Sequence, residues 1–211
     1  MCKIVSKKAD GSYVGMSDIY DSHLKNLLRA ILEVKREYFY YATNNVAGDS
    51  ELQEQLERIF AYELYHQWSI IQKEKNDNSS DQDKRIINGE GGKKLDGVQI
   101  YPDLILHKGQ KDMEHQEIAV EIKRKVGLQG DNLIRDLIKL SKLITYGKLA
   151  YNAKEFKYGV FILTGGVKED IISLLTTNQA KDVDDRIICI FCNGDNQLSF
   201  ATMGEIKSEL I

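Results

Sequence analysis

The pattern of apolar and polar residues changes character about halfway along the chain. In the first part, apolar residues recur at helical spacing, which predicts two amphipathic helices. The first helix covers residues 17–41, with Ser17 as its N-cap, and the second begins at Asp49 or Ser50. Residues 74–97 are polar and rich in turn-forming residues, so they predict a long surface loop.

Strand-like segments dominate the rest of the chain and alternate with helical ones. Short apolar runs bounded by turn residues predict strands, whereas leucine and isoleucine at helical spacing predict helices. The predicted elements are strands at residues 98–107, 116–125, 158–166 and 186–192, and helices at residues 131–152 and 168–180. This order predicts a three-layer α/β/α fold, in which helices flank a central mixed β-sheet.

The length and composition of the chain are those of one folded domain. It has 211 residues, and a hydrophobic fraction of 42% is sufficient for a sizeable core. We therefore predict a single domain over residues 1–211. It consists of an N-terminal helical pair (17–73), the polar loop (74–97) and an α/β core (98–211).

Charged residues interrupt the predicted hairpin where buried apolar residues are expected. Side chains alternate along a strand, so Glu121 and Lys123 share one face of theirs. If Asp103 on the first strand pairs with Glu121, the hairpin is centred on residue 112, in the middle of its polar turn. This register places two carboxylates about 5 Å apart on the same face. They repel each other unless one is protonated or a cation lies between them.

A hard divalent cation would relieve this repulsion. Mg²⁺ prefers oxygen ligands and usually keeps several waters, so two carboxylates and one backbone carbonyl are sufficient. The carbonyl of Ile122 lies between the two charged side chains of its strand and is the predicted third ligand. Lys123, next to this site, would orient an attacking water or neutralise phosphate oxygens.

These residues resemble a known motif. Pro102-Asp103, followed by Glu121-x-Lys123 on the next strand, resembles the signature of the PD-(D/E)XK nuclease superfamily, whose fold is called restriction-endonuclease-like. The resemblance covers residues 52–192, and "ELYHQ", "PDLILH", "VEIK" and "DLIKL" are similar to an uncharacterised bacterial branch. It implies hydrolysis of nucleic-acid phosphodiesters that depends on Mg²⁺, with Mn²⁺ as a substitute. It also implies that Asp103 and Glu121 are metal ligands and that Lys123 is the catalytic lysine.

The superfamily usually adds an acidic residue from a helix that precedes the hairpin. Glu63 is the predicted residue, as a further metal ligand, because it and Gln67 lie within an apolar stripe of the second helix, where a carboxylate needs a partner. A buried ion pair with lysine or arginine is the structural alternative. Glu90, in the polar loop, is the second candidate for the same role.

Other residues are weaker candidates for substrate contact or for support of the site. His107 would project from the same face as Asp103, although a histidine at a strand end is more often structural. Gln67 would accompany Glu63. Asp136 and Lys139, in the helix after the motif, could contact the backbone of a nucleic acid, although charges of a solvated helix face are the more common case.

The charge distribution favours a polyanionic partner, although the net charge of the chain is −3. From Glu121 to Lys157, nine basic residues accompany four acidic ones, a net charge of +5, whereas the remainder carries −8. Charge alone is equally consistent with a solvated helix face. Together with the motif, it leads us to expect nucleic acid, and DNA first, as the partner. A homodimer and a separate specificity subunit both remain open.

Other sequence features indicate where the protein acts and which alternatives compete. Three cysteines do not form a disulfide framework, and the sequence has neither a signal peptide nor a membrane span, so we expect a cytoplasmic protein without a membrane partner. The alternative to a nuclease is a catalytically silent nuclease-like fold that binds nucleic acid or another protein.

Overall fold

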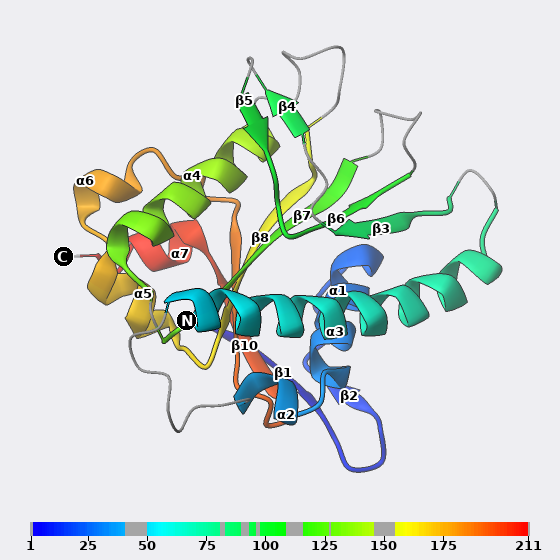
Figure 1. Ribbon diagram of the computed structural model, residues 1–211. Coiled ribbons are helices and arrows are strands. Elements are labelled where there is room, and N and C mark those ends of the chain that lie inside the picture. Colours follow the sequence, from blue (N-terminus) through cyan, green and yellow to red (C-terminus); the bar gives the residue numbers. More distant parts are fainter. Residues whose placement is uncertain are drawn as a thin grey trace.

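The computed structural model describes residues 2–40, 50–80, 83–89, 93–95, 98–108, 116–126, 128–145 and 155–210. Within these residues, eight strands form one sheet in the order β2-β1-β10-β9-β8-β7-β6-β3 (Figure 1). The strands are β1 (Lys3–Lys7), β2 (Tyr13–Val14), β3 (Ile86–Gly89), β6 (Leu104–His107), β7 (Gln116–Arg124), β8 (Tyr158–Thr164), β9 (Ile188–Cys192) and β10 (Gln197–Thr202). A separate antiparallel pair consists of β4 (Lys93–Leu95) and β5 (Val98–Ile100).

Helices cover both faces of this sheet (Figure 1). They are α1 (Ser22–Glu33), α2 (Glu37–Tyr40), α3 (Ser50–Asp77), α4 (Gly130–Thr145), α5 (Lys168–Leu174), α6 (Thr177–Ala180) and α7 (Met203–Lys207). The sheet is mixed, because β7, β8 and β9 are parallel to one another and the outer strands pair antiparallel. The predicted α/β fold with a mixed central sheet is thus confirmed.

Alternation along the central strands divides the hydrophobic core into two layers. In β7, Ile118, Val120 and Ile122 pack with α1 and α3, whereas Ala119 packs with α4 on the opposite face. All four side chains are almost fully buried. Because successive side chains of a strand point to opposite faces, β7 contributes to both core layers. A central strand covered on both faces therefore needs apolar residues on both.

The long helix α3 contributes a regular apolar stripe to the first core layer. Leu56, Phe60, Leu64 and Trp68 recur every four residues and are almost fully buried. Residues four apart lie on the same helix face, so this stripe is the part of α3 that packs on α1 and the sheet. The aromatic ring of Phe60 also meets that of Phe39 edge-on, with ring centroids 5.0 Å apart.

Three predictions about the first half of the chain need correction. The chain begins with the strands β1 and β2, so an N-terminal helical pair is not what the structure shows, and the predicted helix 17–41 is divided between α1 and α2. The predicted loop 74–97 contains the end of α3 and the strands β3 and β4. The reason is long-range pairing: β1 pairs with β10, and β3 pairs with β6. Neither partner is close in sequence, so local patterns did not indicate these strands.

The C-terminal part also differs in detail from the prediction. The predicted helix 168–180 is two short helices, α5 and α6. Helix α4 ends at Thr145, and residues 146–152 of the predicted longer helix lie outside the described residues. The strand β10 and the helix α7 follow the last predicted strand and complete the sheet and the second core layer.

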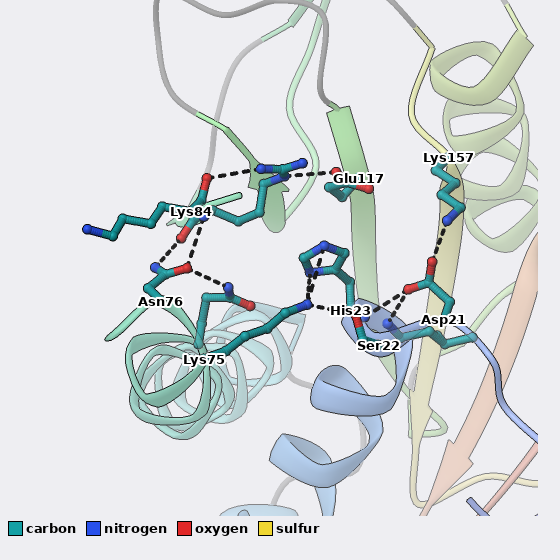
Figure 2. Close-up of polar contacts among 11 residues, drawn as sticks. Asp21, Ser22, His23, Lys75, Asn76, Lys84, Glu117 and Lys157 are labelled. Atoms are coloured by element: carbon teal, nitrogen blue, oxygen red, sulfur yellow. Dashed lines mark hydrogen bonds and ion pairs between the residues drawn. The ribbon is translucent and has the colours of Figure 1, made fainter. Parts of the chain in front are cut away.

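A polar network fastens the end of α3 to its neighbours (Figure 2). Nζ of Lys75 donates to Oγ of Ser22 at 2.7 Å and lies 3.2 Å from Nδ1 of His23, which joins α3 to the start of α1. Asn76 bonds to the backbone of Arg85 in both directions, at 2.7 and 3.1 Å. Arg85 in turn pairs with Glu117 of β7 at 2.8 Å. The network thus ties α3 to α1, to the start of β3 and to β7.

We expect Asn76→Ala to lower the free energy of unfolding by about 1–3 kcal/mol, because it leaves backbone groups of Arg85 without their partner. Urea denaturation followed by circular dichroism measures the loss. Asn78→Ala is the matched control, since the exposed side chain of Asn78 donates to the carbonyl of Glu74 at the end of the same helix. Equal stability of the two variants would contradict the bridging role of Asn76.

Candidate active site

The pairing of β6 with β7 sets two carboxylates opposite each other. Leu104 pairs with Val120, and the next two residues of β6 continue the same antiparallel register. Extended by one residue, this register places Asp103 opposite Glu121, as the sequence predicts. These two positions bring two carboxyl groups together at the start of β6.

Beyond this point, β7 continues without β6 beside it. The strand β6 begins at Leu104, so the last residues of β7 extend past it on that side. The backbone N–H of Ile122 donates to Oδ2 of Asp103 at 2.7 Å, and the N–H of Arg124 donates to Oε1 of Glu57 at 3.2 Å. Two carboxylates therefore accept the hydrogen bonds that a partner strand would otherwise accept. The carbonyl of Ile122 points to the same open side as its N–H.

Glu121 is the most buried charged residue of this region, with 3% of its surface exposed. Nζ of Lys139, on α4, lies 2.5 Å from its Oε2 atom and forms an ion pair with it. Apart from this ammonium group, the buried Oε2 has no partner among the described residues. A cation therefore already lies on the side of the carboxylate where a metal ion could bind.

Lys123 lies between two acidic residues from helices on opposite faces of the sheet. Its Nζ is 3.1 Å from Oε2 of Glu57 on α3 and 3.8 Å from Oδ2 of Asp136 on α4. The N-terminal part of α3 and the first half of α4 therefore meet at the end of β7. Six charged side chains gather here, and we call Glu57, Asp103, Glu121, Lys123, Asp136 and Lys139 the acidic cluster.

Burial dominates the electrostatics of the acidic cluster. It raises the pKa of Glu57, Asp103 and Asp136, because a charged carboxylate loses its hydration inside the protein. Burial and then the charge of Asp103 raise the pKa of Glu121 to about 8. Burial lowers the pKa of Lys123, but Glu57, Asp136 and Glu121 outweigh this effect, so its net direction is upward. Lys123 is thus a permanent cation at neutral pH.

The residues of the acidic cluster suit a divalent cation. Four carboxylates and two ammonium groups carry a net charge of −2 when all are ionised, which one divalent ion would neutralise. The Oε2 atom of Glu121, the adjacent Asp103 and the carbonyl of Ile122 are all oxygen donors, as Mg²⁺ prefers. Within the part of the chain that the structure describes, no group of three or more His, Cys, Asp or Glu is spaced to hold a metal. Water would therefore complete the coordination of an ion held by two carboxylates.

The structure brings together Asp103, Glu121, Ile122, Lys123 and Lys139, but it places Glu63 elsewhere. Glu63 accepts a hydrogen bond from Nε2 of Gln67 at 2.7 Å, within α3. Glu57 takes the position beside Lys123. The two glutamates are six residues apart, which separates them by about 9 Å along the helix and by about a third of a turn around it. The carboxylate that α3 contributes to the cluster is therefore Glu57.

Neither of the remaining predicted residues joins the acidic cluster in the described structure. His107 is buried at the far end of β6, about 13 Å along the strand from Asp103, and its Nε2 lies 3.0 Å from Nδ2 of Asn88. His107 pairs with Ile86 of β3 in the same continuous register as Ile105 with Asn88, so it shares the face of Ile105 but lies at the opposite end of β6 from Asp103. Glu90 lies outside the described residues.

Glu57 was not singled out from the sequence, and Asp136 and Lys139 were considered there as backbone contacts and not as neighbours of the carboxylates. Glu57 directly follows Leu56, so it borders the apolar stripe of α3 without interrupting it. Asp136 and Lys139 are three residues apart on α4, beside Leu137 and Leu140, and therefore lie at the edge of its buried face. The sequence signal that could have identified these residues is a charged residue at the border of an apolar helix face, rather than at its centre.

The positive segment from residue 121 to 157 is partly neutralised within the fold. Lys123 and Lys139 face the acidic cluster, Lys125 pairs with Asp170 at 3.0 Å, and Lys157 pairs with Asp21. Its described lysines are therefore engaged with carboxylates to a greater extent than the sequence suggested.

Comparisons with known proteins find no relative of this chain. No family model matches the chain, and neither curated proteins nor solved structures show a significant similarity to it. Among the described residues, no helix combines the length and apolar character needed to span a bilayer.

Proposed function

We propose that this protein is a Mg²⁺-dependent nuclease that hydrolyses phosphodiester bonds of nucleic acid, with DNA as the expected substrate. The observation that supports it most is the register of β6 and β7, which sets Asp103 opposite Glu121 with Lys123 two residues further along β7. The proposal also draws on the resemblance of these residues to the PD-(D/E)XK motif. The restriction-endonuclease-like fold belongs to the same proposal.

Each residue of the acidic cluster has a role in this proposal. Asp103, Glu121 and the Ile122 carbonyl would hold the ion, whose chemistry when bound would be to activate a water and to offset negative charge on the phosphate. Lys123 directs its ammonium group toward the attacking water or the phosphate oxygens. Glu57 and Asp136 hold that ammonium group in place from two helices. Burial of the site strengthens these charge interactions.

A catalytically silent fold that binds nucleic acid or protein is the second candidate. It is favoured by one observation: ammonium groups already neutralise much of the acidic cluster, and described lysines of the positive segment pair with carboxylates. Such a protein has no requirement for a metal. The two proposals therefore differ in metal binding as well as in cleavage.

The deciding experiment incubates the purified protein with single- and double-stranded DNA and RNA, each with Mg²⁺, Mn²⁺ or chelator. A nuclease cleaves at least one substrate with metal and none with chelator. Failure to cleave any substrate, together with failure to bind Mn²⁺ in calorimetry, would reject the proposal in favour of the silent fold.

Glu57→Gln should lower the cleavage rate by about 10–100-fold, the usual effect of removing a group that orients the chemistry without performing it. The variant loses the charge that holds Lys123 but keeps the shape of the side chain. Glu63→Gln is the matched change on the same helix, and it should have a much smaller effect, because Glu63 bonds to Gln67 and not to the cluster.

Initial rates of the two variants, measured at saturating Mg²⁺, provide the comparison. Thermal melts of both variants show whether a lower rate reflects lost folding. A larger loss of activity in Glu63→Gln than in Glu57→Gln would indicate that Glu63, and not Glu57, is the carboxylate that α3 contributes to the site.

A further inference from the structure

The ion pair of Glu121 with Lys139 has no role in the mechanism proposed above. The side chain of Glu121 is 4% exposed and Lys139 reaches it from α4, on the face of the second core layer. Asp103 lies beside the same carboxylate, and its charge acts on Glu121. A buried carboxylate next to another carboxylate is stabilised by a proton or by a cation, and Lys139 supplies the cation when no metal is bound.

Lys139 and a divalent ion would compete for the same oxygen. The ammonium group approaches Oε2 of Glu121 to 2.5 Å, a distance at which a metal cannot share that side of the carboxylate. The contact joins an ammonium group to a carboxylate, so charge attraction and hydrogen bonding both contribute to it. A doubly charged ion offers the same oxygen a stronger electrostatic attraction.

The two lysines of the acidic cluster have similar exposure but differ in the number of carboxylates that hold them. Lys123, with 26% of its side chain exposed, contacts carboxylates from both α3 and α4. Among the described residues, Lys139 forms one ion pair, to Glu121, and 23% of its side chain is exposed. A lysine side chain is long and flexible, so Lys139 can turn toward solvent while its backbone stays on α4.

We propose that Lys139 is an internal counter-cation that occupies the metal-free site and must leave Glu121 before a divalent ion binds. Lys139 thereby lowers the affinity for metal and keeps the buried carboxylates compatible with folding in its absence. This inference rests on the proposed function, because it requires that Glu121 binds a metal. Lys139 is then a positioning residue and not a phosphate contact.

The experiment measures Mn²⁺ binding by isothermal titration calorimetry at one pH, on wild type, Lys139→Met and Lys139→Gln. Both changes remove the charge, and glutamine keeps a group that can donate to Glu121 if methionine disturbs folding. We expect both variants to bind Mn²⁺ at least about tenfold more tightly than wild type, since a like charge next to the ion is lost. Lys142→Met is the matched control, because exposed Lys142 lies on the same helix and should leave the affinity unchanged.

The outcomes separate this inference from the proposed function. If wild type binds Mn²⁺ and Glu121→Gln does not, the metal site exists. Equal or weaker binding by the two Lys139 variants then overturns the counter-cation role alone. Binding by the variants but not by wild type supports it strongly. Absence of binding in every protein, including the variants, overturns the metal site and this inference together.

Discussion

Asp103→Asn and Glu121→Gln should each reduce nucleic-acid cleavage by about three orders of magnitude or more. Either change keeps the shape of the side chain and removes one of the two charges that would hold the ion. A bound metal ion contributes several kcal/mol to stabilising the charge of the transition state, and each 1.4 kcal/mol is about a factor of ten in rate. Cleavage under single-turnover conditions in Mg²⁺ measures the effect on the chemical step.

Glu117→Gln is the control for the carboxylate variants, because it places the same kind of change on the same strand. Glu117 lies near the start of β7 and pairs with Arg85, far along the strand from Lys123. It should keep most of the activity. Near-full cleavage by Asp103→Asn and Glu121→Gln, in protein shown to be free of contaminating nucleases, would remove both residues from the active site.

The second large effect is expected on stability and its dependence on pH, without any metal. Burial and the neighbouring Asp103 raise the pKa of Glu121 to about 8 in the folded protein, from an ordinary value of 4.5. Between these values the folded state binds more protons than the unfolded state, so stability must fall as pH rises through this range. Glu121→Gln has no ionisable group at this position, so it lacks this pH dependence. Its stability relative to wild type should therefore increase from pH 5 to pH 9.

The size of this effect follows from the size of the pKa shift. Each pKa unit corresponds to about 1.4 kcal/mol, so a shift of this size sets an upper bound of about 5 kcal/mol. We expect the difference between variant and wild type to grow by about 2–4 kcal/mol between pH 5 and pH 9, because water penetration relieves part of the burial. Urea denaturation in chelator, at both pH values, measures it.

Asp103→Asn helps to assign the cause of this pH dependence. Asp103 raises the pKa of Glu121 by its charge, so its removal should shift the pH dependence of wild type to lower pH without abolishing it. A stability difference between Glu121→Gln and wild type that is the same at pH 5 and pH 9 would show that Glu121 is not held in this buried, charge-crowded state.

The sequence by itself determined the parts of the site that depend on local period. Alternation along β7 put Glu121 and Lys123 on one face, and the polar turn centred on residue 112 indicated that Asp103 lies opposite Glu121. A strand has a period of two, and a hairpin register is set by its own turn, so both features can be read over a short stretch. The mixed sheet followed from the order of the strands and helices.

Only the tertiary structure decided which helical residues complete the site. Glu57 and Glu63 are both glutamates near the apolar stripe of α3, and their distinction depends on where along its length the helix crosses the end of β7. The contact between Lys139 and Glu121 depends in the same way on how α4 lies over the sheet. The strands β1 and β3 required partners distant in sequence. These features come from packing between separate segments, and no local pattern records the position of one segment on another.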